Sequence, residues 1–482
     1  MSKLYITIAL FIFAHITTGQ IHEILNTSYD QYRVAEIKTK RFKSEEIYEE
    51  LLQYQSSSLI HIEEVSRSMG DKPIYLVELG KGDIKVFLWS QMHGNESTAT
   101  MALMDILRFL SADDQFNDLR SQILSQIKIF MIPLLNPDGG DRFERRNNLG
   151  VDLNRDAVRL QTPEAKILME TRNRIHADFG FNLHDQNRRN GVGRTGKPAS
   201  ISFLSPAFNY EKEMDENRED AMRVISIMIN TLNQYIPGQI GKYSDDFEPR
   251  AFGDNFQKLG TRTILIESGY TYNDDEKQHL RKMNYLSIME ALNAIATGSF
   301  QDVPTTAYDQ LPFNNGNMAD LVIRNIDYQL DGKRYLIDIA FERNEVKDQG
   351  ENVHYVRRIS DVGDLSTTFG YIELDAENLD LNWGASYKKV LNSSEKLTDQ
   401  KVNELVTRGI NTVFVRALSE QDRFKNLDNI HVLQSGKEVN KRLDYGSNPA
   451  FYLSKGKDFK FYICNGKAWK IEGGTMHEVK EE

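Results

Sequence analysis

Polar residues of types that suit metal binding and acid–base chemistry close three short apolar runs of this chain. In chain order they are His93 and Glu96 after the run 84–90, His184 after the run 179–183, and Glu267 after the run 263–266. A histidine and a carboxylate three residues apart on a turn or helix start can project to the same side. A second histidine from a neighbouring strand end would complete a His2Glu zinc site with one position left for water.

The spacing of His93 and Glu96 alone is weak evidence. With 10 His and 70 acids in 482 residues, about 1.5 acids are expected three positions after a His by chance. Two occur, and the other is His61 with Glu64. That pair lies in an expected strand, where alternation would send the two side chains to opposite faces. The neighbours of His93 and Glu96 must therefore decide their role.

Alternating strands and helices are expected to position these residues. The expected strands are 74–79, 84–90, 127–135, 179–184 and 263–267, and the expected helices are 44–55, 97–110, 163–176 and 216–235. This alternation predicts an α/β domain with a central sheet. Open α/β sheets present ligands at the carboxyl ends of their strands, which is where His184 and Glu267 stand.

The chain changes character after about residue 300. Residues 298–317 are loop-like, and a period-2 pattern dominates beyond them. Expected strands are 335–341, 353–357, 369–374, 412–415, 450–453 and 459–464, with one helix at 401–407. We therefore expect an α/β domain over 20–300, a linker over 301–318, and a smaller β-rich domain of unassigned role over 319–482.

Composition excludes several classes of protein. Lys and Arg total 59 against 70 for Asp and Glu, and the net charge of -11 argues against a nucleic-acid partner. The hydrophobic share of 40% is ordinary for a globular protein, and the mean hydropathy of -0.51 excludes a multi-span membrane protein. The single cysteine, Cys464, permits no internal disulfide and lies in the β-rich half. A thiol nucleophile or thiol metal ligand is therefore not expected.

The N-terminus has the three-part layout of a secretory signal. Lys3 precedes an apolar run from Leu4 to Ala14, and small residues follow as far as Gly19. We predict a signal peptide over 1–19 with cleavage near Gly19, with an uncleaved anchor as the alternative. Export without disulfides favours a periplasmic or secreted bacterial protein.

An ordered set of motifs from about residue 47 to 297 resembles the zinc carboxypeptidase family, of the carboxypeptidase A type. The matching stretches are a loose one at 66–74, then His93-Gly-Asn-Glu96, Asn136-Pro-Asp-Gly139, Gly150-Val-Asp-Leu-Asn-Arg155, Asn182-Leu-His184 and Ile264-Leu-Ile-Glu-Ser268. The resemblance implies a central mixed sheet flanked by helices. It also implies a metallocarboxypeptidase of the bacterial secreted type, with one Zn²⁺ per chain bound by His93, Glu96 and His184.

The resemblance also implies the remaining roles. Glu267 would be the general base that takes a proton from zinc-bound water and hands it to the leaving amine. Arg145 would stabilise the oxyanion, with Arg142 or Arg146 as alternatives on spacing. Asn154 and Arg155 would bind the substrate's terminal carboxylate, although Arg155 could instead pair with Asp152 or Asp156.

The sequence departs from the family pattern in three places. Tyr243 is close to the expected position of a substrate-capping tyrosine but has a different context, Lys-Tyr-Ser-Asp-Asp-Phe. Asp185 and Gln186 follow His184 where the digestive enzymes have Ser. Residues 248–255 lie where the family builds its specificity pocket, so Arg250 or Asp254 is expected to face the substrate. The preferred terminal residue stays open between acidic, basic and unusual ones.

Three functions compete. The first is hydrolysis of the C-terminal peptide bond of peptides or proteins, with no nucleic acid and no stable membrane insertion after signal cleavage. The second is a zinc amidase or deacylase acting on cell-wall peptides or acylated amino acids. The third is a binding protein on a catalytically dead scaffold. The presence of the full set of site residues argues against it; these are His93, Glu96, His184, Arg145 and Glu267.

Overall fold

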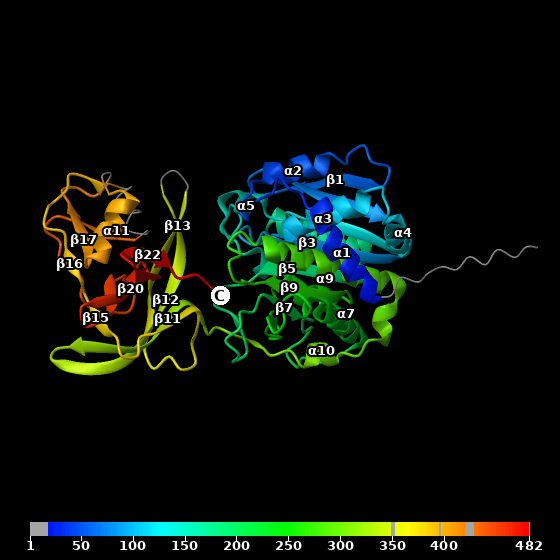
Figure 1. The fold of residues 1–482 in the computed structure, drawn as a ribbon. Helices are drawn as coiled ribbons and strands as arrows, with labels where there is room; N and C mark the ends of the chain where they lie inside the picture. The colour runs from blue at the N-terminus through cyan, green and yellow to red at the C-terminus, as the bar shows by residue number, and fades with distance from the viewer. Residues whose placement is uncertain (1–17, 349–351, 395–396, 420–428, 482) are drawn as a thin grey trace, which may run out of the picture. The chain divides into compact units, whose positions relative to one another are not determined.

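The computed structural model describes residues 18–348, 352–394, 397–419 and 429–481 (Figure 1). It divides into two compact units. The first contains the described residues up to Asn187 together with Ala199–Asn314, and the second contains Arg188–Pro198 together with the residues from Asn315 onward. Most of the predicted signal peptide at 1–19 lies outside the described residues. Within the described ranges, no helix is both long and apolar enough to cross a membrane.

An eight-stranded sheet forms the centre of the first unit, in the order β1-β2-β4-β3-β5-β9-β7-β8. Its middle strands β4, β3, β5 and β9 run parallel, whereas β1, β2 and β7 pair antiparallel with a neighbour. The predicted α/β class with a mixed sheet is therefore confirmed. The strands are β1 (Ile60–Arg67), β2 (Pro73–Gly80), β3 (Ile84–Ser90), β4 (Ile127–Ile132), β5 (Phe179–Asp185), β7 (Ile201–Leu204), β8 (Ile240–Lys242) and β9 (Arg262–Ser268).

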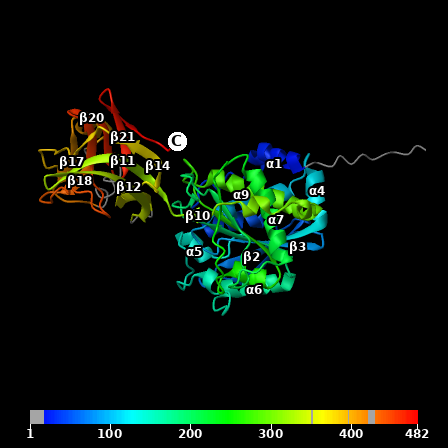
Figure 2. The same cartoon turned by 90° about the horizontal axis from the view of Figure 1, so that it is seen from below.

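Helices cover both faces of this sheet (Figure 2). The larger core lies between the sheet and α1 (Thr18–Tyr32), α3 (Thr98–Ser111), α4 (Asn117–Gln126), α7 (Glu216–Leu232) and α9 (Gln278–Thr297). The second core lies on the opposite face, under α6 (Pro163–Ile175) and α8 (Phe252–Lys258). The shorter helices of this unit are α2 (Ser44–Leu52), α5 (Pro137–Arg142), η1 (Leu153–Arg155), η2 (Ser299–Asp302) and α10 (Thr306–Asp309).

The structure differs from the predicted linker at 301–318. η2 and α10 pack on α7, and the aromatic ring of Tyr308 is buried in the first unit. Apolar residues in this Pro- and Asn-rich stretch therefore add to the core, and the boundary between the units falls at Asn314/Asn315. A further difference is that residues 188–198, which include β6 (Gly191–Val192), belong to the second unit.

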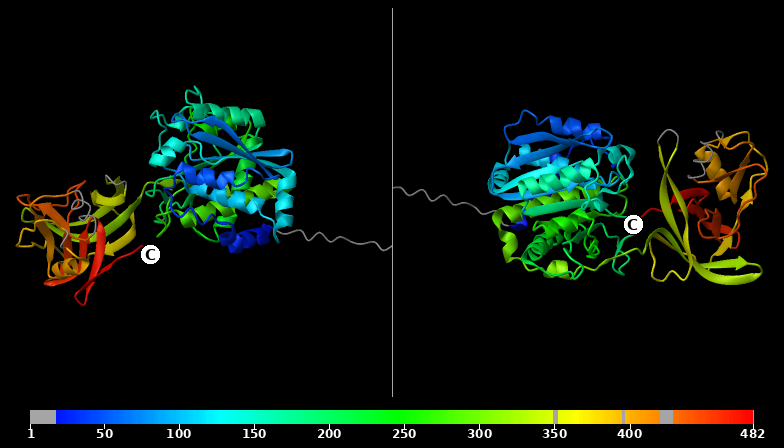
Figure 3. Two further views of the ribbon diagram at one scale, coloured as in Figure 1. Left: turned by 90° about the horizontal axis from the view of Figure 1, so that it is seen from above. Right: turned by 180° about the vertical axis from the view of Figure 1, so that it is seen from behind.

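The second unit is β-rich, as predicted (Figure 3). Its largest sheet has the order β13-β12-β11-β15-β19-β20-β21-β22, with β14 also paired to β11, and a three-stranded sheet β16-β17-β18 lies beside α11 (Asp399–Thr407). The short strand β10 (Asn314–Asn315) spans the boundary. The strands after it are β11 (Met318–Leu330), β12 (Lys333–Lys347), β13 (Val353–Gly363), β14 (Phe369–Asp375), β15 (Asp380–Asn382), β16 (Ala385–Ser386), β17 (Ile410–Val415), β18 (His431–Gln434), β19 (Phe451–Lys455), β20 (Asp458–Cys464), β21 (Lys467–Glu472) and β22 (Thr475–Glu478).

Candidate active site

Strand alternation places His184 and Glu267 side by side. On β5, Phe181 and Leu183 point into the larger core, as Ile266 does on β9. Successive strand residues face opposite sides, so His184 and Glu267 point to the other face of the sheet. The two strands are parallel, and His184 pairs directly with Glu267 in their register. Both side chains are buried, with residue exposures of 3% and 7%.

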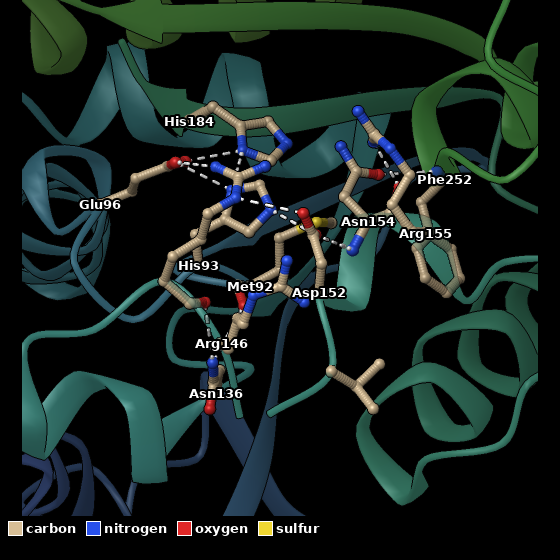
Figure 4. A network of polar contacts seen from close by, with 12 residues as sticks. Met92, His93, Glu96, Asn136, Arg146, Asp152, Asn154, Arg155, His184 and Phe252 are labelled. Carbon is tan, nitrogen blue, oxygen red and sulfur yellow. Dashed lines mark hydrogen bonds and ion pairs between the residues drawn. The ribbon is translucent and has the colours of Figure 1, made fainter. Parts of the chain in front are cut away.

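The loop between β3 and α3 carries His93 and Glu96. It turns so that the Glu96 N–H donates to the His93 carbonyl over 3.0 Å. A Cβ on Gly94 would lie 2.0 Å from the carbonyl carbon of Gly139 in α5, so the close approach of the two backbones requires glycine at this position. The Asn136 amide donates to the Met92 carbonyl over 3.1 Å and fixes the same loop (Figure 4). The Asn-Pro-Asp-Gly motif therefore supports the loop that presents His93.

His93, Glu96 and His184 converge on one point (Figure 4). The two Nδ1 atoms of the histidines are 3.2 Å apart, and the Glu96 carboxylate oxygens lie 2.9 Å and 2.8 Å from them. Two nitrogens bound to one zinc at about 2.0–2.1 Å in tetrahedral geometry would lie roughly 3.3 Å apart. The histidine spacing fits that value, and the carboxylate would need to move outward by only a few tenths of an ångström. The donor set of two imidazoles and one carboxylate therefore fits zinc.

Asp152 connects this cluster to Arg145. Its Oδ1 lies 3.0 Å from His93 Nε2, and its Oδ2 accepts from Arg145 Nε over 3.1 Å. A carboxylate on the far nitrogen of a metal-binding histidine fixes the tautomer and the ring orientation. Arg145 Nη1 also donates to Glu96 over 2.9 Å, so its guanidinium lies beside the candidate ligands.

The charges of this cluster are strongly coupled. Burial alone would raise the pKa of the Glu96 carboxyl, but His93 and His184 outweigh burial and hold that pKa well below its usual range. Burial lowers the pKa of His184. Burial also acts to lower the pKa of His93, but the carboxylates of Glu96 and Asp152 outweigh it and raise that pKa. Metal ligands must be deprotonated, so protons compete with a metal chiefly at His93.

Glu267 has the surroundings of a proton acceptor. Burial, followed by the nearby charges of Glu96 and Asp185, raises the pKa of its carboxyl well above the usual value. A base with a raised pKa binds a transferred proton more readily. The charge of Glu267, followed by burial, also raises the pKa of Tyr243 to about 12, which keeps that phenol protonated as a hydrogen-bond donor near the base.

A cleft of about 400 Å³ brings most of the candidate residues together. Its lining includes His93, Glu96, Arg145, Asn154, Arg155, His184, Tyr243 and Glu267. Asn154 is held by its Oδ1, which accepts from the Phe252 N–H over 2.9 Å (Figure 4). Arg155 donates to the Asn154 carbonyl over 2.7 Å and pairs with Glu248 over 3.2 Å. The partner of Arg155 is thus Glu248 rather than either acid considered from the sequence.

The structure differs from our prediction at Arg250. Its side chain is 56% exposed, pairs with Glu248 over 2.9 Å and is not part of the cleft lining. Asp254, the other candidate of that segment, does line the cleft. The alternatives to Arg145 lie elsewhere: Arg142 bonds Glu144, and Arg146 bonds the Gly150 carbonyl.

Sequence reasoning missed two residues of this site. Asp152 was considered only as a partner of Arg155, although its place in the Gly150–Arg155 motif was a signal. Asn182 lines the cleft two residues before His184, and strand alternation could have placed it on the same face. Its Oδ1 is buried and has no hydrogen-bond partner among the described residues.

Residues 46–216 match the family model for zinc carboxypeptidase. The chain is similar to carboxypeptidase 2 of Trichophyton tonsurans, with 26% identity over 143 residues that cover 30% of this chain and 25% of that protein. It is also similar to carboxypeptidase SOL1 of Arabidopsis thaliana, with 24% identity over 144 residues that cover 27% of this chain and 29% of that protein. The chain thus spans about a quarter of the length of these curated relatives.

Solved structures of carboxypeptidases are also similar to this chain. The metallo-carboxypeptidase from Burkholderia cenocepacia has 15% identity and a TM-score of 0.44, and the match covers 54% of this chain and 70% of that one. The matched family range contains His93, Glu96, Arg145 and His184 and ends before Tyr243 and Glu267. Residues 46–216 are thus similar to the zinc carboxypeptidase family.

Proposed function

We propose that this protein is a zinc-dependent metallocarboxypeptidase that hydrolyses the C-terminal peptide bond of peptides or proteins. The observation that carries the proposal is the cleft that joins a His2Glu cluster to a buried carboxyl, Glu267, and to the guanidinium of Arg155. The cluster suits a metal, Glu267 suits a base, and Arg155 suits a carboxylate. Hydrolysis at a chain end needs these three functions in one place.

The residues of the cleft divide the work of the reaction. When bound, zinc would polarise the scissile carbonyl and lower the pKa of a water molecule to roughly 7. Glu267 takes the proton of the attacking water and returns it to the leaving amine. Arg145 supplies positive charge to the oxyanion that develops as water adds to the carbonyl. Tyr243, kept protonated, can donate a hydrogen bond to the substrate beside the base.

Recognition of a free carboxylate follows from Asn154 and Arg155. A guanidinium binds a planar carboxylate through two parallel hydrogen bonds. Arg155 now pairs with Glu248, so a substrate carboxylate would compete with that acid or share the guanidinium with it. A zinc amidase or deacylase would use the same residues for a carboxylate that is not a peptide C-terminus. Both readings require a free carboxylate on the substrate, so action on amidated peptides would indicate internal cleavage instead.

The cleft also favours one class of terminal side chain. Burial raises the pKa of Asp254 to about 7, and one of its oxygens accepts from the Glu248 N–H over 2.9 Å. Asn182 adds a buried oxygen without a partner among the described residues. Two acceptors in one cleft suit a cationic, donor-rich side chain. We therefore propose a preference for C-terminal Lys or Arg.

The test is mass spectrometry of a peptide library whose members end in Lys, Arg, Leu, Phe or Glu, each with a free and an amidated C-terminus. We expect loss of a single residue from free ends only, fastest for Lys and Arg, and loss of this activity with a chelator. Equal action on amidated peptides would contradict the role of Arg155. Release of an acyl group or of cell-wall fragments, without trimming of peptides, would favour the amidase alternative.

The base is tested separately by Glu267→Gln, which keeps the size of the side chain but cannot accept a proton. We expect the variant to bind zinc as the wild type does and to lose turnover by at least about 100-fold. A near-normal rate would mean that another group is the base.

We also propose that the protein is exported through the N-terminal segment that resembles a signal peptide. Support comes from the layout of Lys3, the apolar run and the small residues up to Gly19. N-terminal sequencing of the protein recovered outside the cytoplasm should begin near residue 20. An intact N-terminus would favour an anchor.

A further inference from the structure

The chain passes between the two units three times. It crosses at Asn187/Arg188, returns at Pro198/Ala199 and crosses again at Asn314/Asn315. The first crossing lies only four residues after the candidate ligand His184. The second leads directly into β7, whose Ser202 pairs with Glu267 in the register of β7 and β9. Two of the three crossings therefore begin or end at strands of the active site.

Within the second unit, residues 188–198 are firmly held. Arg188 forms ion pairs with Asp320 over 3.0 Å and with Glu481 over 3.1 Å, and its guanidinium lies 4.6 Å from the centre of the Tyr371 ring. The Tyr371 hydroxyl donates to the Arg188 carbonyl over 2.7 Å. The side chains of Arg188, Asp320 and Glu481 are 15%, 8% and 14% exposed, so these charges are shielded from water and weakly screened.

Backbone bonds add to this anchoring. The Met318 N–H donates to the Arg189 carbonyl over 3.0 Å, and the side-chain Nδ2 of Asn317 donates to the Gly193 carbonyl over 3.1 Å. Residues 188–198 therefore form part of the β-rich unit, although both of their ends connect to the catalytic sheet.

Within the first unit, Gln186 lies just before the first crossing and forms hydrogen bonds to the residues at the other two. Its Nε2 donates to the Ala199 carbonyl over 3.0 Å and to Ser202 Oγ over 2.8 Å. Its Oε1 accepts from Asn314 Nδ2 over 2.6 Å, and its backbone N–H donates to the Ser268 carbonyl over 3.0 Å. One side chain thus contacts the residue at the return, Ala199, and the residue at the second exit, Asn314.

The same bonds reach the strands that carry the chemistry. Gln186 follows His184 by two residues on the continuation of β5, Ser268 follows Glu267 directly on β9, and Ser202 is the register partner of Glu267 on β7. A shift at Gln186 would therefore change the spacing between His184 and Glu267. Displacements of about 1 Å in such groups can cost roughly 100-fold in rate.

We infer that Gln186 is a positioning residue that fixes the spacing of His184 and Glu267, and that the anchoring of residues 188–198 through Arg188 in the β-rich unit supports this position. The roles of His184 and Glu267 rest on the proposed function, whereas the bonds of Gln186 do not.

The test compares four variants of the full-length protein. Gln186→Ala removes the hydrogen bonds of the side chain, and Arg188→Met removes its ion pairs. Gln257→Ala is the control for the first, because Gln257 is a buried glutamine whose side chain bonds β9, at the Thr263 N–H over 2.9 Å. Arg189→Met is the control for the second, because the Arg189 side chain is 52% exposed and forms an ion pair with Glu342.

The readouts are the zinc dissociation constant, kcat, KM and the melting temperature. We expect Gln186→Ala to weaken zinc binding and to lower kcat, each by about tenfold, the lower end of what outer-shell residues cost. Arg188→Met should also weaken zinc binding and lower kcat, each by a smaller factor. The two controls should keep both values within about twofold, even if Gln257→Ala lowers the melting temperature.

A Gln186→Ala protein that loses only thermal stability, as the Gln257 control does, would overturn the inference. An Arg188→Met protein with the zinc dissociation constant and kcat of the wild type would overturn the part of the inference that concerns Arg188. If Gln186→Ala does not fold, Gln186→Glu keeps the acceptor for Asn314, removes both donors and should show the same direction of change. If the wild type binds zinc but trims no peptide, the proposed function fails, and the zinc dissociation constants still decide this inference.

Discussion

Asp152 gives the sharpest test of how this chain prepares its candidate metal site. Its two oxygens reach His93 Nε2 over 3.0 Å and Arg145 Nε over 3.1 Å, so a single carboxylate orients one ligand and the neighbouring cation. Asp152→Asn keeps the shape of the side chain and removes its charge. The amide can still accept from His93, but its NH2 group then faces the N–H of Arg145, and two donors repel each other.

The expected loss can be estimated from these contacts. A hydrogen bond to a charged group contributes about 1.5–3 kcal/mol, and one of the two bonds is lost while the other is weakened. Outer-shell partners of metal-binding histidines typically cost about 10–100-fold in affinity when they are replaced, which is about 1.4–2.7 kcal/mol. We therefore expect the zinc dissociation constant of Asp152→Asn to rise by about 10–100-fold.

The assay is competition for zinc with a chelator of known affinity, at fixed pH. Asp156→Asn is a matched control, because Asp156 directly follows the same motif and is buried, but it bonds the backbone N–H groups of Gln161 and Thr162. The control should lose stability and keep its zinc affinity. An Asp152→Asn protein whose zinc affinity equals that of the control would refute the role given to this carboxylate.

Three further predictions follow from other contacts. Arg155→Met should lower kcat/KM for free C-terminal peptides by about 10–100-fold, chiefly through KM, and a change in kcat alone would contradict carboxylate binding. The pKa of Asp254 is raised to about 7, so its carboxyl becomes neutral as the pH drops through 7. The ratio of kcat/KM for Lys-terminated peptides to kcat/KM for Leu-terminated peptides should then fall. A pH-independent ratio, or an unchanged ratio in Asp254→Asn, would contradict this preference. Asp105→Ala should lower the free energy of unfolding in urea by about 3–5 kcal/mol, because it leaves the fully buried Arg281, 2.7 Å away, without its counter-charge; a loss below about 1 kcal/mol would contradict the importance of this ion pair.

Much of the first unit could be predicted from sequence periodicity. The expected strand 84–90 is β3, and the expected helices 97–110 and 163–176 match α3 and α6 to within one residue at each end. Buried strands and amphipathic helices have local signals of this kind. β1 had a weaker signal, used only for the alternation of His61 and Glu64, because Ile60–Arg67 mixes polar and apolar residues and only Ile60 is buried.

The site was predictable where one motif carries a whole role and less so where distant segments meet. His93 and Glu96 share one loop, and His184 and Glu267 each close a strand, so sequence order sufficed to nominate them. Arg250 was predicted from its segment alone, and its exposed side chain pairs with Glu248 without lining the cleft.

The contacts of the second unit had no sequence signal of this kind. Residues 188–198 look like an ordinary loop between two strands. Their membership in the β-rich unit depends on Asp320 and Glu481, which are 132 and 293 residues from Arg188 in the chain. Such long-range ion pairs become visible only in three dimensions.

The central claim is that one zinc ion held by His93, Glu96 and His184 drives the removal of C-terminal residues. The most direct measurement is a zinc titration of the chelator-stripped, full-length protein, followed by release of the terminal residue from a free peptide. We predict that activity returns in proportion to added zinc, saturates at one equivalent per chain, and is absent from His184→Gln at the same zinc concentration. Full activity in the stripped protein, or in His184→Gln, would contradict the account.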